Sequence, residues 1–189
     1  SAQIADEISR TGGTFRVQGG RNTLLINVEM LKENLPFALE LSADVLMNPA
    51  FDAGELDNVK RLVKFQIDRM MRDAGGATSV RFNKLIYGDH PYAHMPIGTA
   101  ESVDRVGPED LRAFVARFAA PDNCVVGVVG DLSAAELKAA LEKAFAGFKP
   151  AGVKLPEVPE VVKLEKGTKD DVTDPTKQMG VAMIGFQTV

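Results

Sequence analysis

The segment from Asp52 to Asp73 has the strongest helical periodicity in the chain, and it constrains the fold more than any other stretch. Apolar side chains recur there every three or four residues, which is the spacing of one face of an α-helix. This apolar stripe consists of Leu56, Val59, Leu62, Val63, Ile67 and Met70. The charged face carries Lys60, Lys64, Asp68 and Arg72. A helix of this kind must bury its apolar face against other elements, and Ala74-Gly75-Gly76 is predicted to end it.

Turn and capping residues divide the rest of the chain into short strands and helices. The pattern predicts helices over residues 2–10, 34–47, 77–86, 108–118 and 133–145. It predicts strands over Thr14–Val17, Thr23–Met30, 123–130, 160–166 and 178–186, the first two joined by a glycine turn. Ser133 and Glu136 have the spacing of a capping box. This order favours an α+β fold, with a mostly antiparallel sheet and helices packed on one face.

Composition excludes several classes of function. The 189 residues are 45% hydrophobic, which is enough for a buried core. The net charge is −4 and no block of basic residues occurs, so a nucleic-acid partner is not expected. The apolar runs are too short for a membrane span. The single cysteine, Cys124, lies in a valine-rich run and is predicted to be buried and inert.

Four short phrases occur along the chain in a characteristic order and spacing. They are Leu35-Pro36-x-Ala38-Leu39, Asn48-Pro49-Ala50-Phe51, Tyr87-Gly88-x-His90-Pro91-Tyr92, and Pro121-x-Asn123 followed by Val128-Val129-Gly130-Asp131. Each phrase is short, but together they are specific. In this order the sequence resembles the pitrilysin/insulinase group of zinc metallopeptidases, the inverzincins, which includes the mitochondrial processing peptidases.

The resemblance implies a domain organisation. Residues 1–147 correspond to most of one peptidase-like domain, without its first strands and the helix that carries the metal motif. Residues 148–160, which are rich in proline and glycine, are expected to be a linker. Residues 161–189 are expected to begin a second, homologous domain. The chain is thus expected to be an internal piece of a longer protein, with the bacterial periplasm or cytoplasm as its expected compartment.

Active members of this group hold zinc with an H-x-x-E-H motif and a glutamate further along the chain. No H-x-x-E-H occurs here. The resemblance places the ligand glutamate at Gln66 and a supporting acidic residue at Val59, and an amide oxygen is a poor zinc ligand. His90 and His94 flank a proline that disfavours a helix, so they are predicted to be solvated loop histidines. We therefore predict no catalytic residue, no metal ligand and no cofactor in this chain, although active relatives carry zinc.

Loss of the metal leaves peptide binding possible. In this group an extended substrate adds to an exposed strand edge through main-chain hydrogen bonds. The resemblance places that edge at Phe15, Arg16 and Val17. The alternative interpretation is that these residues form an ordinary strand with no ligand.

Three functional hypotheses follow. The first is a catalytically inactive domain of a zinc protease, which helps to bind extended peptide beside an active partner subunit or the second half of the same chain. The second is a fragment of an active zinc metalloendopeptidase with H-x-x-E-H upstream of residue 1, against which Gln66 argues. The third is a scaffold or interaction domain without a proteolytic role. No partner is expected to be nucleic acid, and no membrane span is expected.

Overall fold

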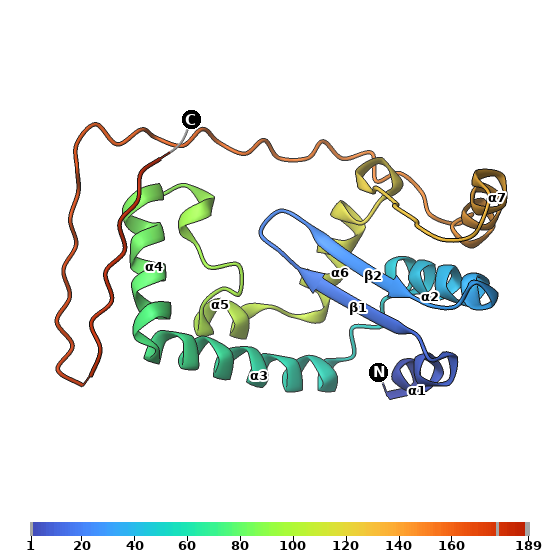
Figure 1. Cartoon of the computed structure of the whole chain (residues 1–189), viewed down its shortest axis with the longest axis horizontal. Coiled ribbons are helices and arrows are strands. Elements are labelled where there is room, and N and C mark those ends of the chain that lie inside the picture. Colours follow the sequence, from blue (N-terminus) through green and yellow to red (C-terminus); the bar gives the residue numbers. More distant parts are fainter. Residues whose placement is uncertain (1, 177, 188–189) are drawn as a thin grey trace. The chain divides into compact units, whose positions relative to one another are not determined.

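The computed structural model describes residues 2–176 and 178–187 (Figure 1). Residues 1, 177 and 188–189 of the predicted domains lie outside the described part. The chain forms two compact units, each built from two separate pieces of the sequence. Unit 1 comprises the described residues up to Phe51 together with Pro108–Leu155. Unit 2 comprises Asp52–Gly107 together with the described residues from Pro156 onward. Among the described helices, none is both long and apolar enough to cross a membrane.

Unit 1 combines helices with a β-hairpin. Its helical elements are α1 (Ala2–Thr11), α2 (Leu35–Met47), α6 (Pro108–Phe118), α7 (Ala134–Ala144) and the 3-10 turns η1 (Lys32–Asn34) and η3 (Pro121–Asn123). Strands β1 (Thr14–Gly19) and β2 (Leu24–Glu29) pair antiparallel, with Val17 opposite Ile26. The Gly20 amide donates to the Thr23 carbonyl at 2.7 Å and closes the turn. The hairpin predicted from the glycine turn is therefore confirmed.

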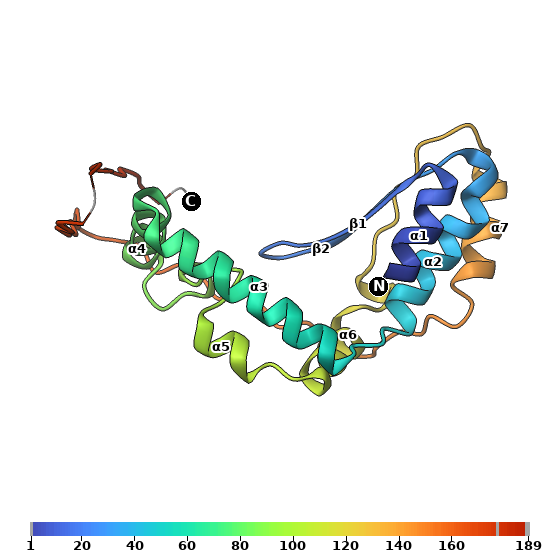
Figure 2. The same cartoon turned by 90° about the horizontal axis from the view of Figure 1, so that it is seen from below.

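The core of unit 1 lies along α2, which is beside α7 (Figures 1 and 2). The buried residues of α2 are Ala38, Leu39, Leu41 and Ala43. Among them Ala43 is only 2% exposed, so the space around it admits no larger side chain without strain.

A reciprocal cap begins α7, as the sequence predicts. The Ser133 hydroxyl accepts a hydrogen bond from the Glu136 amide at 3.2 Å, and the Glu136 carboxylate accepts one from the Ser133 amide at 2.8 Å. The backbone N–H of Ser133, followed by its hydroxyl, lowers the pKa of Glu136 below its ordinary value. The folded state thus favours the ionised carboxylate, and the cap weakens as the pH falls into the range where Glu136 is protonated.

Unit 2 is built on two consecutive helices. Its helical elements are α3 (Ala53–Arg72), α4 (Ala74–Tyr87), η2 (Pro91–Ala93) and α5 (Ala100–Arg105). Asp73 ends α3 and immediately caps α4 by accepting a hydrogen bond from the Gly76 amide at 2.8 Å. The predicted end of the helix before Ala74 is therefore confirmed, but residues 74–76 form the first turn of α4, which begins three residues earlier than predicted. A β-carbon at Gly76 would collide with the Met70 carbonyl, so the glycine permits the tight corner between the two helices.

Side chains tie the last part of unit 2 to α4. The Arg81 guanidinium donates two hydrogen bonds to the Asp170 carboxylate, at 2.9 and 3.0 Å. The Gln187 amide group donates to the carbonyls of Ile86 and Val162, at 2.8 and 3.0 Å. It also accepts a hydrogen bond from the Leu164 amide at 2.8 Å. These contacts hold a segment without helix or strand against the end of a helix.

The strands predicted over 123–130, 160–166 and 178–186 are not formed in the described part of the chain. Cys124 does have extended backbone angles, with φ −124° and ψ 138°. A strand exists, however, only through hydrogen bonds to a neighbouring strand, and the described sheet consists of β1 and β2. The α+β class is confirmed, with helices and a small antiparallel sheet. The prediction that Cys124 is buried is wrong, because the whole run around it is exposed.

Candidate functional site

Gln66, the position that the resemblance assigns to the metal ligand, lies on the exposed side of α3. Gln66 and Val59 are both exposed, and Leu62, between them on the same face, is 64% exposed. Ile67, the next residue after Gln66, is by contrast 7% exposed and lies on the buried side of the helix. The predicted apolar stripe is therefore divided, and its part at positions 59 and 62 is not buried. We call the surface formed by Val59, Leu62 and Gln66 the outer face of α3.

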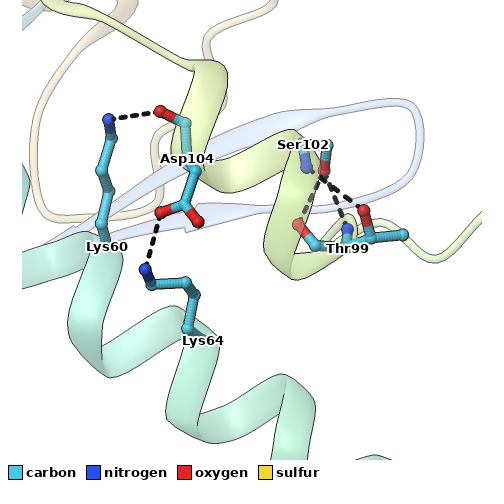
Figure 3. A network of polar contacts seen from close by, with 5 residues as sticks. All are labelled: Lys60, Lys64, Thr99, Ser102 and Asp104. Carbon is cyan, nitrogen blue, oxygen red and sulfur yellow. Dashed lines mark hydrogen bonds and ion pairs between the residues drawn. The ribbon is translucent and has the colours of Figure 1, made fainter.

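The inner face of α3 carries charges that the sequence assigned to solvent. Lys64 forms an ion pair with the Asp104 carboxylate at 2.6 Å, and Lys60 donates to the Asp104 main-chain carbonyl at 3.1 Å (Figure 3). Figure 3 also shows Thr99 and Ser102, whose reciprocal hydrogen bonds cap α5. The two lysines are half-buried because their alkyl stems cross the helix surface to reach α5. They connect the inner face of α3 to α5.

The outer face of α3 does not have the chemistry of a zinc site. It offers an amide from Gln66 and alkyl groups from Val59 and Leu62, whereas zinc takes carboxylate, imidazole or thiolate. Glu55 lies on the same side but eleven residues before Gln66, about 16 Å along the helix axis at 1.5 Å per residue. Across the described residues, no group of three or more His, Cys, Asp or Glu side chains is placed to hold a metal ion. The residues present therefore do not fit the cation.

His90 is buried rather than solvated, which corrects the prediction for this residue. It is 7% exposed and packs edge-on against the Tyr92 ring. Its Nδ1 accepts a hydrogen bond from the Tyr92 amide at 3.1 Å, and its Nε2 lies 2.8 Å from the Pro159 carbonyl oxygen. The first contact needs an acceptor and the second a donor, so the ring carries its proton on Nε2. With both nitrogens engaged, the ring has no lone pair for a metal. His94 is exposed, as predicted.

Replacing His90 with alanine is expected to destabilise unit 2 by roughly 1–3 kcal/mol, because it leaves the Tyr92 amide and the Pro159 carbonyl without partners. Urea unfolding followed by tyrosine fluorescence measures the change. The matched control is His94→Ala, an exposed position expected to stay within about 0.5 kcal/mol of the unchanged chain. Equal effects of the two changes would contradict the hydrogen-bonding role of His90.

The predicted substrate residues lie on β1, in unit 1. Phe15 is half-buried, while Arg16 and Val17 are exposed. Phe15 and Val17 point to one face of the hairpin and Arg16 to the other, because side chains alternate along a strand. One edge of β1 pairs with β2, and no second strand pairs with β1 among the described residues. This arrangement leaves main-chain donors and acceptors on an open edge.

The residues that organise unit 2 were not found by sequence reasoning. Asp104 lies 40 residues from Lys64, and Pro159 lies 69 residues from His90. Nothing in the local pattern marks either of them as a partner. The only local signal was the spacing of Lys60 and Lys64, which places both lysines on the same helical face.

Two family models match the chain. Residues 1–86 match the model described as insulinase, peptidase family M16, and residues 105–189 match the model described as the peptidase M16 inactive domain. A crystal structure of a peptidase M16 inactive domain from Pseudomonas fluorescens is similar, with a TM-score of 0.79 and 27% sequence identity. That match covers 86% of this chain and 40% of the Pseudomonas chain.

Curated relatives point to the same family. The chain is 28% identical over 151 residues to YmxG, described as an uncharacterized zinc protease, from Bacillus subtilis. That match covers 79% of this chain but only 36% of YmxG. It is also 22% identical to a probable mitochondrial-processing peptidase subunit beta from Schizosaccharomyces pombe, over 95% of this chain and 40% of that protein. With matches to two models of one family covering most of its length, and with the same fold, this chain belongs to the insulinase (M16) family of peptidases.

Proposed function

We propose that this chain is a non-catalytic part of a zinc-protease-like protein that holds extended peptide, while a partner subunit or another part of the same protein performs the hydrolysis. The observation that carries the proposal is the outer face of α3. An amide and alkyl groups stand there in place of anionic oxygen donors. The match of residues 105–189 to an inactive M16 domain supports the same conclusion.

Gln66 and Val59 are uncharged, so neither position of α3 carries a charge that a bound cation would offset. We therefore propose that α3 is kept for packing, with Ile67 and the two lysines on its inner face.

The peptide-binding part of the proposal rests on β1. Its edge presents main-chain groups without a strand partner in the described residues, which is the geometry that β-strand addition requires. We propose that an extended peptide adds along Phe15, Arg16 and Val17. We also propose that residues 1–147 form most of one domain, that residues 148–160 are a linker and that residues 161–189 begin a second domain.

Peptide binding is tested with Val17→Asp and a matched control on the other strand, Leu24→Asp. Val17 and Leu24 are equally exposed, at 48% and 50%, so neither change disturbs a core. The probe is a fluorescein-labelled, unstructured peptide with alternating apolar and polar residues, followed by anisotropy. Val17→Asp is expected to weaken binding roughly tenfold, or about 1.4 kcal/mol, because the new carboxylate is desolvated by the added strand. Leu24→Asp is expected to bind like the unchanged chain.

Two outcomes would contradict the proposal. The first is that the unchanged chain does not bind the peptide, or that both aspartate variants lose binding equally. The second is stoichiometric binding of zinc. Calorimetric titration of the chain with zinc chloride is expected to show no such binding. Stoichiometric zinc binding that Gln66→Ala removes would show that this position still ligates a metal.

A further inference from the structure

The hairpin of β1 and β2 has an apolar face and a mostly polar face. Residues that lie opposite each other in the two strands point to the same face, and successive residues of one strand point to opposite faces. The apolar face carries Phe15, Val17, Leu24, Ile26 and Val28. The other face carries Thr14, Arg16, Gln18, Asn27 and Glu29, with Leu25 among them. A peptide strand that adds to β1 would extend both faces.

The hydrogen bond that closes the turn determines which main-chain groups of β1 point to its open edge. The Gly20 amide donates to the Thr23 carbonyl at 2.7 Å, so these two residues are a hydrogen-bonded pair of the ladder. Such pairs alternate with non-hydrogen-bonded pairs along antiparallel strands. In the register of this hairpin, Arg16 therefore directs its main-chain N–H and C=O toward β2. Phe15 and Val17 direct theirs to the open edge, where a peptide can pair with them.

The same alternation places the side chain of Arg16 closest to the added strand. A peptide that pairs antiparallel makes its main-chain hydrogen bonds with Phe15 and Val17, so its residue opposite Arg16 belongs to a non-hydrogen-bonded pair. In such a pair the two Cα atoms are about 4.5 Å apart, and the side chains are closer than in a hydrogen-bonded pair. The two neighbours of that peptide residue lie beside Phe15 and Val17, on the apolar face.

The guanidinium of Arg16 has no carboxylate partner in the described part of the chain. Arg16 is exposed, and it forms no ion pair or side-chain hydrogen bond with the described residues. The residue opposite it on β2 is Asn27, which carries no charge. Glu29 is on the same face but diagonally across, and diagonal neighbours are about 7–8 Å apart. The closest cross-strand position on the open side of Arg16 therefore favours a carboxylate, to which a guanidinium donates charge-assisted hydrogen bonds.

We propose that Arg16 determines which peptides add to β1, by selecting an acidic residue at the position opposite its own side chain. The inference rests on the peptide binding proposed above and names its substrate class. That class is an extended peptide in which an aspartate or glutamate stands between two apolar residues. The carboxylate pairs with Arg16, and the apolar residues cover Phe15 and Val17. A basic residue at the same position places like charges opposite each other and weakens binding.

The test uses three fluorescein-labelled, unstructured peptides that differ only in a central residue between two valines. This residue is glutamate, glutamine or lysine, and binding to the whole chain is followed by anisotropy. The glutamate peptide is expected to bind about fivefold more tightly than the lysine peptide, with the glutamine peptide between them. Arg16→Glu is expected to reverse this order. Added salt is expected to reduce the preference, because the charge pair is exposed.

The matched control is Arg21→Glu in the hairpin turn, which makes the same change in net charge at an exposed position outside β1. It is expected to keep the order of the unchanged chain, and circular dichroism confirms that each variant is folded. Equal binding of the three peptides, or an unchanged order in Arg16→Glu, would overturn the role of Arg16 and leave peptide binding at β1 in place. If none of the peptides binds, the proposed function itself is contradicted, and the preference with it.

Discussion

Replacing Ile67 with alanine is expected to lower the free energy of unfolding of unit 2 by roughly 2–5 kcal/mol. Ile67 is the buried residue of α3, and the shorter side chain would leave a cavity on the inner face of the helix. Both tyrosines of the chain, Tyr87 and Tyr92, lie in unit 2. Urea unfolding followed by tyrosine fluorescence therefore reports on this unit, and the chain has no tryptophan to obscure the signal.

The control for this experiment is Leu62→Ala, on the outer face of the same helix. Leu62 is an apolar side chain of the same size, but it is mostly exposed, so its removal is expected to change the stability by no more than about 0.5 kcal/mol. A large loss for Leu62→Ala would mean that the outer face of α3 is covered. That result would contradict the orientation of α3, and with it the exposed position of Gln66.

The sequence of α3 does not predict which side of the helix is buried. Apolar residues occur on both sides of the helix, so the periodicity predicts a helix and its ends but does not select the side that is buried. In the structure the buried side is the one that carries Ile67, and Lys60 and Lys64 on that side engage Asp104 of α5. Asp104 is distant in sequence, and no local rule identifies it.

The strands likewise could be predicted only where both partners lie close together in the sequence. β1 and β2 were predictable because a glycine turn places the two partners next to each other in the sequence. The run at 123–130 has an equally good β-prone pattern, but a pattern does not supply a neighbouring strand. Likewise, the burial of His90 depends on the Pro159 carbonyl, and the motif around the histidine contains no sign of that partner.

The chemistry of the candidate site, in contrast, could be predicted almost entirely from residue types. A zinc site requires anionic or imidazole donors in a fixed set, and it is visible without a structure that Gln66 and Val59, the two positions to which the resemblance points, are neither. The structure adds the environment of the position. Gln66 and its neighbours Val59 and Leu62 are exposed, whereas the ion pair of Lys64 with Asp104 lies on the inner face of the helix.

The largest effect in unit 1 is expected for Ala43→Asp, which is predicted to lower the free energy of unfolding by roughly 3–5 kcal/mol. Ala43 is 2% exposed on α2, beside α7, and the introduced carboxylate would be buried without a cationic partner. Far-UV circular dichroism during urea unfolding measures the loss, because α2 and α7 both contribute to the helical signal.

The matched control is Ala139→Asp on α7, where the side chain is exposed. It introduces the same charge into a helix of the same unit, so it corrects for the low helix propensity of aspartate, which costs at most about 0.7 kcal/mol relative to alanine. The difference between the two variants isolates the cost of burying the charge at position 43. If they unfold at the same urea concentration, α2 does not pack against α7 at Ala43, and the small side chain there has no structural role.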